Sequence, residues 1–144
     1  MQKIILDTNI IVSALIQKGY PHYIVYEYIF GEYVQLCLSN ALWEEYCEVL
    51  ARSRFSKIPH FKNNSDIVLN RLMKIAVFYE PKISLNVIKD KGDNKLLELA
   101  DESGADFLIT GNHLDFDITH YKNTQILSPR NFWEYVSVEK ISPN

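Results

Sequence analysis

The sequence has few glycines and lacks the short motifs of several common enzyme classes. Glycine occurs five times in 144 residues, and the segment "LDTNIIVSAL" near the N-terminus contains none. A dinucleotide-binding domain would carry a glycine-rich turn after its first strand. The Gly-Lys-Ser/Thr of a P-loop and the Gly-x-Ser-x-Gly of a serine hydrolase are also absent. These absences exclude three widespread classes of α/β enzyme.

Long apolar runs and cysteine clusters are missing too. No segment approaches the length of a membrane span, so we expect no contact with a membrane and a cytoplasmic location. The two cysteines, Cys37 and Cys47, form no Cys-x-x-Cys pair, and the four histidines are scattered. This pattern argues against a zinc site, and we expect both cysteines to be small core residues.

Positive charge is also scarce. The chain has 15 Lys and Arg against 18 Asp and Glu, which gives a net charge of −3 and a pI near 5.8. This balance excludes a broad basic face of the kind that binds nucleic acid by charge alone. A nucleic-acid partner would therefore need a local basic patch, bound metal ions, or both.

The sequence is rich in short apolar runs that alternate with helical patterns. We expect one domain at 1–137 and a C-terminal tail at 138–144. The apolar runs predict strands at 3–6, 33–38, 83–88, 106–110 and 124–127, and helices are predicted at 8–17, 22–31, 40–53, 65–80, 93–103 and 129–137. Such alternation predicts an α/β fold with a mostly parallel sheet and helices on both faces. In sheets of this kind, ligands bind at the carboxyl ends of the strands.

Acidic residues follow several of these runs. Asp7 comes directly after the first run and is followed by Thr8 and Asn9, Glu45 lies at the edge of an apolar helix stripe, and Asp93 opens a later helix. Taken singly, Asp7 or Asp93 could cap a helix, and Glu45 could extend to solvent. Taken together, carboxylates at one sheet edge would repel one another unless they are protonated or bridged by a cation. Oxygen ligands of this kind favour Mg²⁺ or Mn²⁺.

Four segments together resemble a PIN domain: "IILDTNIIVSALI", "LSNALWEEYCEVLARSRF", "KGDNKLLELADESGADFLITGN" and "ILSPRNFWEY". The likeness runs from residue 2 to about 136 and points to the prokaryotic group described as toxins of toxin–antitoxin pairs. It implies a three-layer α/β/α sandwich. It also implies an acidic cluster that binds Mg²⁺ or Mn²⁺ and cleaves single-stranded RNA.

The resemblance also implies roles for individual residues. By position, Asp7 is the family's first aspartate, Glu45 its helix glutamate and Asp93 the acid of the later helix, so we expect all three to be catalytic and to bind the metal. The family's Thr-Gly-Asp turn reads Thr110-Gly111-Asn112 here. Asp115 is the expected replacement for the missing fourth acid, and Asp90 is the second candidate. The expected auxiliary residues are Thr8, Asn9, Asp90, Thr110 and Asn112.

The segment "ARSRFSKIPHFKNN" is basic and aromatic, and we expect it to be a loop that contacts RNA. Its candidate RNA-binding residues are Arg52, Arg54, Lys57 and Lys62, with Phe55 and Phe61 as candidates for base stacking. The aromatic stretch at 20–30 is expected to be either an interface or a buried helix.

The function expected from the resemblance is that of a metal-dependent endoribonuclease, the toxin of a toxin–antitoxin pair. The partners it implies are single-stranded RNA, a cognate antitoxin and a second copy in a homodimer. The alternative is a catalytically weakened PIN-like protein or an RNA interaction module, because Asn112 adds no charge to the site.

Overall fold

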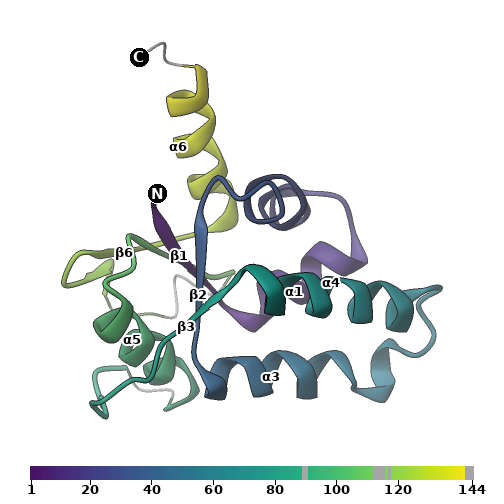
Figure 1. Cartoon of the computed structure of the whole chain (residues 1–144), viewed down its shortest axis with the longest axis horizontal. Helices are drawn as coiled ribbons and strands as arrows, with labels where there is room; N and C mark the ends of the chain where they lie inside the picture. Colours follow the sequence, from purple (N-terminus) through teal and green to yellow (C-terminus); the bar gives the residue numbers. More distant parts are fainter. Residues whose placement is uncertain (89–90, 112–115, 117, 142–144) are drawn as a thin grey trace.

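The computed structural model describes residues 1–88, 91–111, 116 and 118–141. Within these residues, one six-stranded sheet has the order β3-β2-β1-β4-β6-β5 (Figure 1). Every neighbouring pair is parallel except β5 and β6, which are antiparallel. The strands are β1 (Lys3–Leu6), β2 (Gln35–Leu38), β3 (Val77–Phe78), β4 (Phe107–Ile109), β5 (His120–Tyr121) and β6 (Thr124–Leu127). The predicted mostly parallel sheet is confirmed.

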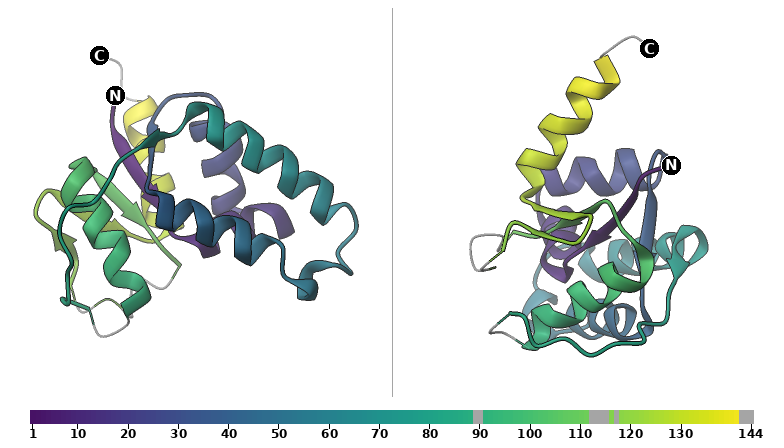
Figure 2. Two further views of the ribbon diagram at one scale, coloured as in Figure 1. Left: turned by 60° about the horizontal axis from the view of Figure 1, so that its bottom comes forward. Right: turned by 90° about the vertical axis from the view of Figure 1, so that its left-hand side faces the viewer.

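Helices lie on both sides of this sheet. Figures 1 and 2 show α5 to one side of the strands and α1, α3 and α4 to the other. The α-helices are α1 (Thr8–Ile16), α2 (Tyr20–Tyr23), α3 (Asn40–Leu50), α4 (Phe61–Ile75), α5 (Lys91–Ser103) and α6 (Pro129–Ile141); η1 (Ile24–Ile29) is a π-helix and η2 (Ser53–Phe55) a 3-10 helix. The three-layer α/β/α sandwich is thus confirmed. None of the described helices has the length and apolar character needed to cross a bilayer.

The central strands are apolar at almost every position because both of their faces are covered. Ile5 and Leu6 of β1 are fully buried, as are Leu108 and Ile109 of β4. These strands give the sheet a rigid centre, from which the loops at its carboxyl edge project.

Several predicted helix boundaries differ from those in the structure. The predicted helix at 65–80 begins earlier, at Phe61, and ends at Ile75, because residues 77–78 form the edge strand β3. The helix predicted at 129–137 extends to Ile141. The predicted loop at 51–64 contains η2 and the first turn of α4.

The predicted strand at 83–88 is wrong, because this segment does not pair with the sheet. Its backbone donors are instead taken by side chains of α5. The Leu85 N–H donates to Glu98 Oε2 at 2.8 Å, and the N–H groups of Val87 and Ile88 both donate to Asn94 Oδ1, at 3.0 and 2.8 Å. The segment is therefore an extended strap along α5, and the apolar pattern reflects the burial of Ile88 at its end.

The aromatic stretch at 20–30 is part buried and part exposed, with the Tyr20 and Tyr23 side chains each 37% exposed. It forms α2 and η1, with Val25, Tyr28 and Ile29 in the core. The Tyr28 ring packs edge-on against Trp133 of α6, with ring centroids 5.2 Å apart. Tyr28 therefore helps to dock α6 as part of a buried helix, and an interface formed by the exposed tyrosines stays a prediction.

Candidate active site

The candidate site lies where the sheet changes direction between β1 and β4. The chain leaves β1 towards β2 on one side, whereas β4 lies on the other side of β1 and pairs onward with β6. Such a switch point leaves a crevice at the carboxyl ends of the strands. Leu6 pairs with Ile109, so the next residues, Asp7 and Thr110, become neighbours although they are 103 positions apart.

Asp7 is 7% exposed, and its carboxylate does not form a capping hydrogen bond to α1. It accepts a hydrogen bond from the Thr110 hydroxyl at 2.8 Å. Burial raises the pKa of Asp7, the Thr110 hydrogen bond lowers it, and the charge of Glu45 raises it again; the nearby N–H groups of Thr8 and Asn9 lower it. The net effect is a raised pKa. A cation close to the buried Asp7 carboxyl group would stabilise its ionised form and lower this raised pKa.

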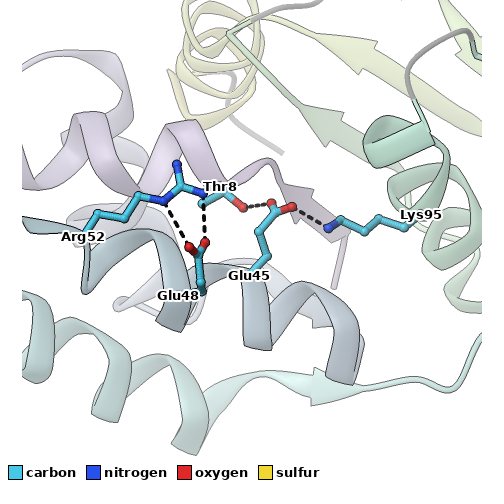
Figure 3. Close-up of polar contacts among 5 residues, drawn as sticks. All are labelled: Thr8, Glu45, Glu48, Arg52 and Lys95. Carbon is cyan, nitrogen blue, oxygen red and sulfur yellow. Dashed lines mark hydrogen bonds and ion pairs between the residues drawn. The ribbon is translucent and has the colours of Figure 1, made fainter. Parts of the chain in front are cut away.

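Glu45 projects from α3 towards the same place (Figure 3). Its Oε2 accepts a hydrogen bond from the Thr8 hydroxyl, and its Oε1 accepts one from the Lys95 ammonium group. The exposed fractions of the Lys95 and Glu45 side chains are 29% and 28%, so the ion pair is partly shielded from water. Glu44 and Glu48 on the same helix are exposed. The helix pattern therefore identified correctly which glutamate faces the core side.

Tyr46 fixes the position of α3 relative to β1. This fully buried residue donates a hydrogen bond from its hydroxyl to the Leu6 carbonyl at 2.5 Å. Burial raises the pKa of Tyr46 well above its ordinary value, and the charges of Asp7 and Glu45 raise it further, so the phenol remains protonated. Because Tyr46 follows Glu45 and Leu6 precedes Asp7, this contact sets the spacing of the two acids.

The three predicted acids line one cavity of about 270 Å³. Asp93 enters it from the first turn of α5 rather than from a cap position. The cavity is lined by Asp7, Thr8, Asn9, Glu45, Val49, Arg52, Arg54, Gly92 and Asp93. The structure therefore brings together acids from three different elements.

The oxygen-rich donors of this cavity fit a hard divalent cation such as Mg²⁺ or Mn²⁺. Burial and the charge of Glu45 both raise the pKa of Asp7, so a cation beside Asp7 would favour its ionised form. Within the described part of the chain, no three acidic, histidine or cysteine side chains come close enough together to enclose a metal ion. The donor chemistry therefore fits a metal, while Lys95 holds one of the donors in the structure as it stands.

Three predicted residues lie outside the described residues: Asp90, Asn112 and Asp115. The predicted auxiliary residue Thr110 contacts Asp7, and Thr8 contacts Glu45. Asn9 lines the cavity, and its backbone N–H lowers the pKa of Asp7.

The four predicted RNA-binding residues are all exposed, but they occupy two different places. Arg52 and Arg54 line the acidic cavity, and Glu48 holds the Arg52 guanidinium through contacts of 2.9 and 3.2 Å (Figure 3). Lys62 pairs with Asp66 at 3.1 Å on the first turns of α4, and Lys57 lies in the preceding turn. Only the two arginines are therefore beside the acids.

The predicted stacking role of Phe55 and Phe61 is wrong for this conformation. The two rings stack on each other, with centroids 4.6 Å apart, and both residues are buried. Their faces are used to pack η2 against the start of α4. They form part of the wall of a second cavity, of about 430 Å³, which shares Arg52 with the acidic cavity.

Sequence reasoning missed Lys95 and the anchoring role of Tyr46. Lys95 is two positions after Asp93, and on a helix this spacing places the two residues on different faces. Its pairing with Glu45 depends on how α5 packs near α3. The hydroxyl of Tyr46 gave a weak signal, since a buried tyrosine usually finds a hydrogen-bond partner.

Comparison with known proteins identifies the family of this chain. Residues 3–114, which contain all three acids, match the model of a family described as PIN domain. The chain is also similar to "Uncharacterized protein MJ1680" of Methanocaldococcus jannaschii, with 31% identity over 111 residues that cover 76% of this chain and 70% of that protein. No solved structure gave a significant match. The chain therefore belongs to the PIN-domain family.

Proposed function

We propose that this chain is a metal-dependent endoribonuclease that cleaves single-stranded RNA. PIN domains are generally nucleases that bind nucleic acid and use divalent metal ions. The observation that carries the proposal is the single cavity lined by Asp7, Glu45 and Asp93 at the carboxyl edge of the sheet. A bound Mg²⁺ or Mn²⁺ would supply an activated water and neutralise charge on the phosphate, as phosphodiester hydrolysis requires.

We assign a different role in this reaction to each residue of the cavity. Asp7 and Asp93 are the residues that would hold the ion. Thr110 orients the Asp7 carboxylate through its hydrogen bond. Glu45 is held by Thr8 and Lys95, which suits it to orient the attacking water. Arg52 and Arg54 lie beside these acids and supply positive charge for the RNA phosphates.

The second cavity supports a path for the RNA strand. It adjoins the acidic cavity at Arg52, and its walls combine apolar side chains such as Leu50 and Leu69 with polar ones such as Ser53 and Asn63. A nucleotide next to the scissile bond would find apolar contact for its base and hydrogen-bond partners for its edge there.

The biological role that we propose is that of the toxin in a toxin–antitoxin pair, with a homodimer as the assembled form. The resemblance to prokaryotic PIN toxins supports this role. An antitoxin could block the acidic cavity with a basic side chain, since Glu45, one of the acids that line it, already pairs with the Lys95 ammonium group.

One observation favours a second candidate, a PIN-like RNA-binding module with little catalytic activity. Glu45 is already paired with Lys95, and the described side chains do not form a closed set of metal ligands. A protein of this kind would bind RNA through Arg52 and Arg54 without cleaving it.

Cleavage of a panel of single-stranded RNAs distinguishes the two candidates. We expect the purified protein to cut RNA with Mg²⁺ or Mn²⁺, to be inactive in EDTA, and to lose at least about a hundredfold in rate on Asp7→Asn substitution, as is usual when a principal charged group of an active site is removed. Glu44→Gln, at an exposed acid of α3 that lines neither cavity, should cleave like the wild type. RNA binding without cleavage by folded protein would favour the binding module, and equal cleavage by the Asp7 variant would reveal a contaminating nuclease.

A further inference from the structure

We propose that Lys95, through its ion pair with the cavity residue Glu45, weakens the binding of divalent metal ions in the acidic cavity. The Lys95 ammonium group binds the Glu45 carboxylate when no metal is bound. Asp7 and Asp93 are then the residues that would hold the ion. This inference rests on the proposed function, since it concerns the metal ion that the nuclease would use.

The first support is the contact itself. Both oxygens of the Glu45 carboxylate are engaged, one by the Thr8 hydroxyl and the other by Lys95 (Figure 3). Lys95 approaches from α5 and Thr8 from α1, so the carboxylate is held between two helices. A metal ion that ligates Glu45 would have to displace one of these partners.

The second support is the shielding of the pair. Among the ion pairs of the described residues, this one has the least exposed cation, with the Lys95 side chain 29% exposed. Charge interactions weaken less in such a place than at the open surface. The Arg52–Glu48 and Lys122–Asp101 pairs have cations that are 46% and 68% exposed.

The third support is the charge balance in the cavity. Asp7, Glu45 and Asp93 line it together with Arg52 and Arg54, and the three carboxylates repel one another there. A nearby ammonium group relieves this repulsion when no metal is present, but it repels an incoming divalent ion. Lys95 should therefore stabilise the metal-free protein and lower its affinity for metal, both through the same charge.

Calorimetric titration with MnCl₂ tests this inference without any measurement of activity. We expect Lys95→Met to bind Mn²⁺ roughly tenfold more tightly than the wild type, because a like charge is removed from a partly shielded site. Lys95→Arg keeps the charge and should bind like the wild type. Lys122→Met is the control. Lys122 pairs with Asp101, which lies on α5 like Lys95, and its removal should leave the Mn²⁺ affinity unchanged.

Thermal unfolding of the same proteins gives a second readout. In EDTA, Lys95→Met should unfold at a lower temperature than the wild type. Saturating Mn²⁺ should raise the unfolding temperature of Lys95→Met by more than it raises that of the wild type. If Lys95→Met is too unstable to titrate, Lys95→Gln, which keeps a hydrogen-bond donor, replaces it with the same expected direction.

The outcomes separate this inference from the proposed function. Binding of Mn²⁺ by the wild type with equal or weaker binding by Lys95→Met would overturn the role of Lys95 and leave the nuclease proposal intact. Failure of every variant to bind Mn²⁺ would contradict the proposed function, and the inference with it. Binding by Lys95→Met alone would support the inference and show that Lys95 blocks the cavity completely.

Discussion

Asp7 and Glu45 are held in the cavity by different kinds of contact. Asp7 is buried and accepts a hydrogen bond from the neutral hydroxyl of Thr110. Glu45 is more exposed and has a cation beside it. Burial without a cation is the situation in which a carboxylate most strongly favours a bound metal or a proton. Asp7 is therefore the residue whose state should report most directly on the cavity.

The raised pKa of Asp7 predicts how metal-free stability depends on pH. The folded protein holds this proton more tightly than the unfolded chain, so the free energy of unfolding falls as pH rises from the ordinary value of 3.8 through the folded pKa. At neutral pH in EDTA, Asp7→Asn should therefore be more stable than the wild type, by on the order of 1 kcal/mol. The difference between the two proteins should shrink as the pH is lowered towards 4.

Thermal melts of both proteins in EDTA between pH 4 and 8 measure this difference. Mn²⁺ should reverse the order at pH 7 by stabilising the wild type alone. A variant that is less stable than the wild type at every pH in EDTA would show that the Asp7 carboxylate is well satisfied without metal, contrary to the account.

The start of α5 is set by a side chain that no motif identifies. Asn94 is 2% exposed, accepts hydrogen bonds from the N–H groups of Val87 and Ile88, and donates to the Ile88 carbonyl at 2.6 Å. These contacts tie the strap at 83–88 to the helix one residue after Asp93. The strap, rather than a strand of the sheet, therefore holds the helix that carries the third acid.

Loss of this clamp should destabilise the protein. Asn94→Ala removes the partner of the buried Ile88 N–H and carbonyl and of the more exposed Val87 N–H, so we expect a loss of about 2–4 kcal/mol in the free energy of unfolding. Asn70→Ala, at an exposed position of α4, is the matched control and should change stability by less than about 0.5 kcal/mol. Urea unfolding of the three proteins gives the values. Equal stability of Asn94→Ala and the wild type would mean that the strap contributes little to the fold.

At the scale of the whole molecule, the sheet order does most to create the site. Asp7, Glu45 and Asp93 are spread over 87 positions of the sequence, yet they meet because β1 lies between β2 and β4. The fold class and this edge were predictable, since buried parallel strands are continuous apolar runs and ligands bind at their carboxyl ends.

Other features were not predictable for physical reasons. An apolar run such as 83–88 does not reveal whether its N–H groups will meet a strand or side chains of a helix. The burial of Phe55 and Phe61 depends on the angle between η2 and α4. The contact between Lys95 and Glu45 joins two helices, and the two residues are 50 positions apart in the sequence. Tertiary packing decides these points, and it leaves no local signal.

The central claim is that the cavity at the end of β1 holds a catalytic divalent ion. The most direct measurement is an anomalous-difference map from crystals of the protein soaked in Mn²⁺. The account predicts a peak within bonding distance of carboxylate oxygens of Asp7 and Asp93, which Mg²⁺ at high concentration should displace. A well-ordered cavity without a peak, or a Mn²⁺ ion bound only elsewhere on the molecule, would contradict it.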